Sequence, residues 1–228
     1  MTSLLFFISK IMKVFLFMGL PYQGKSTIAQ NLYNYLPFDA VTYVSTDGCR
    51  SEYWINADKE GTFDYSAESE KKSWKLFLDK VKSWVICSPP DSYLILDGTM
   101  SNAAHLIELF EALTLNIDFA SSILVVQIFI VGSTDEKRIW KPVSLDFGDP
   151  KEKINTMWKK RCEMKKLQKI DSYVPEQIFA NKVIEMRNTL ETLPRIVKTF
   201  VKQNDKKLIC TISHLPHHVK MRWKAWIK

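Results

Sequence analysis

The chain has 228 residues and a mass of 26.6 kDa, and 46% of its residues are hydrophobic while 25% are charged. This composition is typical of a globular protein with one buried core and excludes a disordered chain. Its apolar runs are shorter than the roughly 20 residues that a membrane-spanning helix needs, so we expect no membrane insertion. The formal net charge is +7, and most of it lies near the C-terminus.

Strands and helices are predicted to alternate over the first 131 residues. Short apolar runs at 12–18, 41–47, 93–99 and 122–131 are typical of buried strands. Between them, residues 26–36, 66–86 and 103–113 carry apolar side chains at helical spacing. This βαβ order predicts an α/β fold with a parallel sheet flanked by helices, whose ligands bind beyond the carboxyl ends of the strands.

The first strand leads into the loop GLPYQGKST at residues 19–27. Its pattern, Gly-x-x-x-x-Gly-Lys-Ser/Thr between a strand and a helix, is that of a P-loop, which cradles the phosphates of a nucleoside triphosphate. Lys25 is predicted to reach the β- and γ-phosphates, and the Ser26 hydroxyl is predicted to bind Mg²⁺. The remaining predicted nucleotide-binding residues are Gly19, Gly24 and Thr27, although capping or packing of the helix start is the favoured role for Thr27.

The second strand ends in STDGCR at residues 45–50. Asp47 is placed to accept a proton from an attacking hydroxyl, the role of the base in phosphoryl transfer. Arg50 could hold an anionic part of the acceptor through its guanidinium group. The alternative is that Asp47 caps the next helix and Arg50 faces solvent. Cys49 lies between them, and ordinary packing is the simpler explanation for it.

The third strand ends in LILDGT at residues 94–99. An apolar strand ending in Asp97 is typical of a Walker B strand, whose acid holds Mg²⁺ directly or through water. Thr99 and Ser101 could bind a phosphate or the acceptor, or could cap the following helix. Residue 95 is Ile95, which argues against a DxDGT-type phosphatase, because the first acid of that motif is absent.

Beyond residue 131 the pattern changes. Residues 133–149 are predicted to be a loop or insertion, 150–169 a strongly basic helix, and 171–193 a further helix. The basic helix contains WKKRCEMKK, and in kinases with a mobile lid such cations close over the triphosphate. Arg161 is the best candidate for that role. The alternative is a solvated charged face.

The C-terminal residues 195–228 hold nine Lys and Arg residues and a single acid. Together with Trp223 and Trp226, this basic segment is typical of nucleic-acid binding. A solvated amphipathic segment packed on the domain explains it as well. The four cysteines show no CxxC spacing, and no secretory signal precedes the first strand. We therefore expect reduced thiols in a cytoplasmic protein.

These motifs, in this order, resemble the polynucleotide-kinase-like P-loop kinases, best known from phage polynucleotide 5′-hydroxyl kinases. The resemblance runs from about Met12 to Leu193. It implies a P-loop kinase domain at 12–194, with a basic helical lid, and a basic extension at 195–228. It also implies ATP and Mg²⁺ as cofactors, bound by Lys25 and Ser26, with Asp47 as the base, Arg50 on an acceptor phosphate and Arg161 in the lid. Lys25, Asp47 and Arg161 are therefore the predicted catalytic groups. The LILDGT motif adds Asp97 as a predicted metal ligand and Thr99 as a predicted contact to the acceptor. The loop interior departs from the family, because Tyr22 and Gln23 replace small residues.

Three functions are compatible with the sequence. The first is an ATP-dependent kinase that phosphorylates a nucleic acid, most simply at a 5′-hydroxyl end. The second is a kinase of a small hydroxylated metabolite, a nucleoside or a modified base. The third is a P-loop switch or binding module without an acceptor, which lacks support because no NKxD motif of a GTPase is present.

Overall fold

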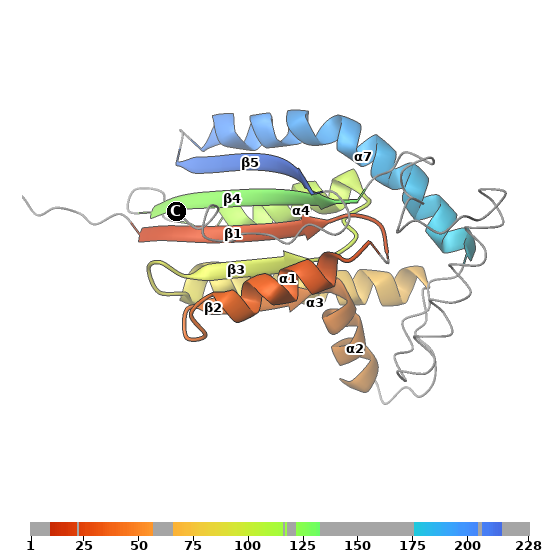
Figure 1. The fold of residues 1–228 in the computed structure, drawn as a ribbon, viewed down its shortest axis with the longest axis horizontal. Coiled ribbons are helices and arrows are strands. Elements are labelled where there is room, and N and C mark those ends of the chain that lie inside the picture. The colour runs from red at the N-terminus through yellow and green to blue at the C-terminus, as the bar shows by residue number, and fades with distance from the viewer. Residues whose placement is uncertain are drawn as a thin grey trace, which may run out of the picture.

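The computed structural model describes residues 10–21, 23–56, 66–115, 117, 122–132, 176–204 and 207–215. Within these ranges five strands form a single sheet, and the four strand pairs described in it are all parallel. The strands are β1 (Lys10–Met18), β2 (Val41–Ser45), β3 (Tyr93–Asp97), β4 (Ser122–Val131) and β5 (Leu208–Leu215). Their order across the sheet is β2-β3-β1-β4-β5 (Figure 1). The predicted α/β fold with a parallel sheet is thereby confirmed.

Helices cover both faces of this sheet (Figure 1). They are α1 (Lys25–Tyr35), α3 (Ala67–Cys87), α4 (Ala103–Thr114) and α7 (Glu176–Gln203), whereas α2 (Thr46–Asn56) packs against α3 and projects beyond the carboxyl edge of the sheet (Figure 1). The alternation of side chains along β1 assigns them to faces. Phe15 and Phe17 pack with α1 in one apolar cluster, whereas Val14 and Leu16 pack in another with α3, α4 and α7. None of the helices in the described ranges is both long enough and apolar enough to cross a membrane.

The central strand explains why the sequence of β1 is continuously apolar. Residues 14–18 are each at most 1% exposed, because helices cover the strand on both faces and β3 and β4 flank it. A strand in this position gains from apolar side chains at every position rather than at alternate ones. β1 therefore fixes the start of the P-loop sequence at the carboxyl edge of the sheet.

The C-terminal part of the chain differs from the predicted division into domain and extension. The boundary at 194/195 falls inside α7, and residues 208–215 form the edge strand of the same sheet. α7 continues past Pro194, although proline removes a helix hydrogen bond. Packing accounts for this continuation, because Ile196 and Val197 are buried in the core and the Phe200 ring stacks on Phe110 at 5.2 Å.

Candidate active site

Three of the predicted motifs meet at the carboxyl edge of the sheet. The loop after β1 bonds to the segment after β3, since the Gly19 N–H donates to the Thr99 carbonyl at 3.3 Å. β2 joins the same edge because Ser45 and Asp97 stand opposite each other in its register with β3. The structure therefore brings together the predicted loop, the predicted base and the predicted metal ligand.

The P-loop sequence is folded on itself. Lys25 is buried, and its Nζ donates to the Leu20 carbonyl at 2.9 Å. The Leu20 N–H donates to Oε1 of the buried Gln23 at 3.1 Å. A Cβ on Gly132 would stand 2.4 Å from the Gln23 side chain, so Gln23 packs tightly against the end of β4. This bulky residue of the loop is thus part of its internal packing.

The start of α1 agrees with a phosphate-binding loop. Gly24 is the N-cap residue, with a left-handed φ of 84°, a conformation that glycine adopts without strain. Ser26 and Thr27 follow in the first turn, and both side chains are exposed. Thr27 is therefore not the cap. The exposed Ser26 hydroxyl is accessible to a metal ion, and the positive dipole end of the helix would favour an anion there. Tyr22 lies outside the described residues.

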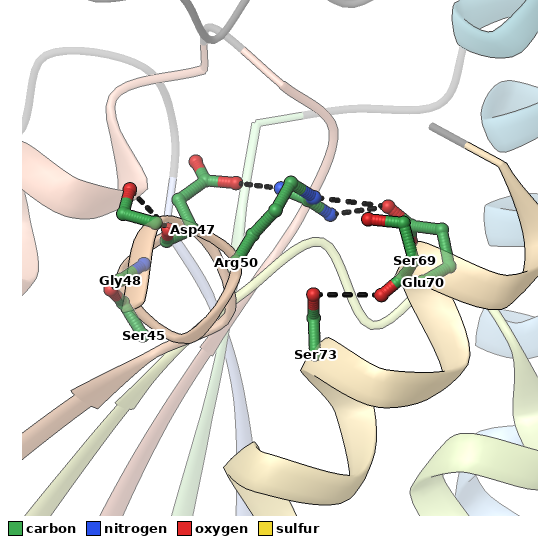
Figure 2. A network of polar contacts seen from close by, with 8 residues as sticks. Ser45, Asp47, Gly48, Arg50, Ser69, Glu70 and Ser73 are labelled. Carbon is green, nitrogen blue, oxygen red and sulfur yellow. Dashed lines mark hydrogen bonds and ion pairs between the residues drawn. The ribbon is translucent and has the colours of Figure 1, made fainter. Parts of the chain in front are cut away.

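Asp47 lies in the first turn of α2 with an exposed carboxylate. The capping position belongs to Ser45, whose Oγ accepts from the Gly48 N–H at 2.9 Å (Figure 2). This arrangement excludes the alternative that Asp47 itself caps the helix. The Asp47 side chain is 65% exposed, so a hydroxyl can approach it from solvent. The two predicted strand residues 46 and 47 thus belong to α2, because a cap at Ser45 starts the helix there.

Arg50 connects Asp47 to a residue that the sequence did not indicate. Its guanidinium donates from Nη1 to Asp47 Oδ1 at 2.6 Å, and from Nη2 and Nε to Glu70 Oε1 at 2.6 and 3.1 Å (Figure 2). The Arg50 side chain is only 7% exposed, which excludes the alternative of an arginine facing solvent. Glu70 belongs to the first turn of α3. The sequence predicts that helix, but it gives no signal that Glu70 contacts Arg50.

Asp97 is buried at the end of β3, at 4% exposure. Its Oδ2 accepts a hydrogen bond from the Tyr43 hydroxyl at 2.8 Å, while its Oδ1 has no hydrogen-bond partner among the described residues. Burial, and then the negative charge of Asp97, raise the pKa of Tyr43 far above its ordinary value, so Tyr43 stays a hydrogen-bond donor. A buried carboxylate oxygen without a partner is what a bound cation would satisfy.

The residues fit Mg²⁺ better than a metal held by protein ligands alone. The described part of the chain contains no group of three or more His, Cys, Asp or Glu side chains that could hold a metal. Mg²⁺ commonly takes one or two carboxylates together with substrate phosphates and water. Asp97 and the exposed hydroxyl of Ser26 match that donor set.

The segment after Asp97 is anchored to α7. The Ser101 hydroxyl donates to Glu185 at 2.8 Å, and the Ser101 carbonyl accepts from the Thr189 hydroxyl at 2.6 Å. The cap of α4 is Asn102, whose side chain accepts from the Ala104 N–H. Ser101 therefore does not cap the helix, and both its hydroxyl and its carbonyl are hydrogen-bonded to α7. Thr99 is half-buried at the same edge, where it remains a candidate for contact with the acceptor.

Three further predictions concern Cys49, the basic lid helix and the basic C-terminal segment. Burial raises the pKa of the Cys49 thiol to about 11, which favours packing over a chemical role. Arg161 and the predicted basic lid helix lie outside the described residues.

Of the basic C-terminal segment, Lys207 lies at the amino edge of the sheet, where its carbonyl accepts from the Leu124 N–H. That edge is opposite to the candidate site.

Comparisons with known proteins leave the family open. No protein-family model matches the chain, and no curated protein matches it by sequence. Among solved structures, a chain from the PezAT toxin–antitoxin system of Streptococcus pneumoniae is 12% identical, with a TM-score of 0.49 over 92% of this chain and 69% of that one. APE1195 is 18% identical, with a TM-score of 0.42 over 82% of this chain and 98% of that one. At these values neither similarity assigns an activity.

Proposed function

We propose that this chain is an ATP-dependent phosphotransferase that moves the γ-phosphate to a hydroxyl group, with a polynucleotide 5′-hydroxyl as the acceptor. One observation carries the proposal. The exposed carboxylate of Asp47 shares a sheet edge with a P-loop sequence and with the buried Asp97 Oδ1, which has no hydrogen-bond partner among the described residues. A module that only binds nucleotide has no proton to remove, so an accessible carboxylate at this edge favours a phosphotransfer reaction.

Each residue has a role in this reaction. The N–H groups at the start of α1 and the Lys25 ammonium would hold the triphosphate. Ser26 and Asp97 would hold Mg²⁺, which neutralises charge on the β- and γ-phosphates when bound. Arg161, in the predicted lid, would add a further positive charge above the transferred group.

Asp47 would accept the proton of the acceptor hydroxyl while that oxygen forms a bond to the γ-phosphorus. The bond between the γ-phosphorus and the β,γ-bridging oxygen breaks, so that ADP leaves and a phosphate monoester forms. Asp47 suits this role because its carboxylate is exposed, and because Arg50 fixes its orientation through Oδ1 at 2.6 Å. General bases of this kind contribute about 10²- to 10⁴-fold to the rate.

The choice of acceptor rests on separate arguments. The polynucleotide is favoured by the resemblance and by the basic residues 195–228. A small hydroxylated metabolite, nucleoside or modified base is the second candidate. It is favoured by the contacts of Arg50, whose Nε, Nη1 and Nη2 already bind carboxylates. An anionic acceptor would have to compete with Asp47 for that guanidinium.

An acceptor panel tests the proposal. The protein is incubated with γ-labelled ATP and Mg²⁺ together with 5′-hydroxyl DNA, 5′-hydroxyl RNA, nucleosides and sugars. Label on the oligonucleotides supports the polynucleotide, and label only on a small acceptor selects the second candidate. Release of phosphate with no labelled acceptor would overturn the proposal of a kinase.

A further inference from the structure

A second carboxylate, that of Glu70, is linked to the proposed base Asp47 through Arg50. Glu70 is held at the N-terminal turn of α3, which is capped by Ser66 through a hydrogen bond to the Ser69 N–H. From there its Oε1 accepts from two nitrogens of Arg50, Nη2 at 2.6 Å and Nε at 3.1 Å. Glu70 lies 20 residues beyond Arg50 in the chain, so this contact joins two helices.

The contacts on the guanidinium are unequal. Glu70 binds the edge formed by Nε and Nη2, while Asp47 receives a single bond from Nη1. Because a guanidinium is planar and rigid, fixing one edge fixes the direction of the others. The two bonds from Glu70 thus determine where Nη1 points, and Nη1 determines the position of the Asp47 carboxylate.

Burial makes this arrangement stronger than an ordinary surface ion pair. The side chain of Arg50 is 7% exposed and that of Glu70 is 33% exposed. Exposed ion pairs contribute little because solvent and salt screen them, whereas charge-assisted bonds to a buried guanidinium are short and strong. Glu68 lies in the same first turn of α3 as Glu70, and it forms an exposed ion pair with Lys72. The Glu68 side chain is 75% exposed, so this pair is a matched comparison for the buried contact of Glu70.

We propose that Glu70 is a positioning residue of the phosphotransfer site, which acts through Arg50 to hold the Asp47 carboxylate in place for the acceptor hydroxyl. This inference rests on the proposed function for the role of Asp47. It assigns Arg50 a fixed orientation before any acceptor binds. The same contacts from Glu70 through Arg50 to Asp47 would position the base for a polynucleotide or for a small acceptor.

Steady-state kinetics of four variants test the proposal. In Glu70→Gln the side chain keeps its size but loses its charge, and we expect kcat to fall about ten- to a hundredfold, as for loss of charge-assisted hydrogen bonds. KM for ATP stays within twofold, because the P-loop is untouched. Glu68→Gln, the matched control, leaves kcat unchanged. In an Arg50→Ala background, Glu70→Gln has no further effect on kcat, because its route to Asp47 is already broken.

A measurement without turnover separates this inference from the proposed function. Phenylglyoxal modifies arginine side chains, and peptide mass mapping reports the rate at Arg50. We expect this rate to rise several-fold in Glu70→Gln and to stay at the wild-type value in Glu68→Gln. If the protein transfers phosphate to no acceptor, the proposed function is rejected. Faster labelling of Arg50 in Glu70→Gln would still show that Glu70 holds the Arg50 guanidinium.

Two results would overturn the positioning role. The first is an unchanged labelling rate at Arg50 in Glu70→Gln. The second is kinetic effects of Glu70→Gln and Arg50→Ala that multiply in the double variant, since independent residues give additive free energies. Melting temperatures of all the variants show whether a loss of kcat reflects unfolded protein instead.

Discussion

Tyr43→Phe is the sharpest perturbation of the proposed metal site. It removes a single hydroxyl, which donates to Oδ2 of the buried Asp97 at 2.8 Å, and it keeps the aromatic ring. Since Oδ1 of Asp97 already lacks a partner among the described residues, the variant leaves both oxygens of the carboxylate without a hydrogen bond. The neighbouring Tyr33, whose ring meets that of Tyr43 edge-on at 6.0 Å, supplies the control Tyr33→Phe.

The hydrogen bond from Tyr43 to Asp97 sets the expected loss of stability and of metal affinity in Tyr43→Phe. A hydrogen bond to a charged group contributes about 1.5–3 kcal/mol, and Asp97 is 4% exposed, so solvent replaces little of the loss. For a chain of this length, about 2 kcal/mol corresponds to a fall in Tm of roughly 4–8 °C. The carboxylate also loses its fixed orientation, and loss of such a supporting bond commonly weakens metal binding about 10- to 100-fold.

Two assays measure these effects. Thermal unfolding in EDTA gives the change in Tm, and Mn²⁺ titration in the presence of ATP, followed by electron paramagnetic resonance, gives the metal affinity. We expect Tyr43→Phe to lose both stability and affinity, whereas Tyr33→Phe keeps its Mn²⁺ affinity. Wild-type Mn²⁺ affinity in Tyr43→Phe would refute the reasoning that Tyr43 orients a metal-binding carboxylate.

The pH dependence of stability gives an independent check on Tyr43. Its pKa in the folded protein is raised above the ordinary value of 10.0, so its contribution is present below about pH 10 and is lost as the pH rises further. Chemical denaturation of the wild type above pH 10 should therefore show a steeper loss than that of Tyr43→Phe. Parallel curves for the two proteins would contradict the assignment.

Three further predictions follow from the described residues. Gly132→Ala places a Cβ 2.4 Å from Gln23 at a φ of +86°, and should cost about 1–3 kcal/mol in chemical denaturation; a wild-type value would show that Gln23 moves aside. At pH 8, iodoacetamide with mass mapping should label the exposed Cys87 before Cys49, whose pKa burial raises to about 11; the reverse order contradicts this packing. Burial lowers the pKa of His105, so its contribution to stability is lost as the pH falls below about 6.5, and His105→Gln should flatten that loss.

Local patterns in the sequence predict four of the five described strands and the edge where the motifs meet. The apolar runs of β1, β3 and β4 carry their own signal, because strands covered on both faces need apolar side chains at every position. Parallel order then places the residues that follow these strands at one edge. Asp47 and Asp97 are predicted as site residues in this way.

Contacts between distant segments were beyond the reach of the sequence. Glu70 is one acid among several in a helix start, and only the packing of α3 beside α2 brings it to Arg50. Tyr43 reads as an ordinary strand residue, and the register of β2 with β3 alone sets it near Asp97. The sequence assigns the residues of β5 to a terminal extension, because their pairing with β4 spans more than 80 residues of sequence. Such tertiary contacts carry no local signature.

The central claim is that Asp47 is the base of a kinase, and one comparison tests it most directly. Transfer of labelled γ-phosphate to the best acceptor is measured for the wild type, for Asp47→Asn, and for Asp39→Asn, an exposed acid ahead of β2 at the opposite edge of the sheet. Removal of a general base predicts a loss of about 10²- to 10⁴-fold in kcat for Asp47→Asn, with unchanged ATP binding and a wild-type rate for Asp39→Asn. Transfer by Asp47→Asn at the wild-type rate would contradict the claim.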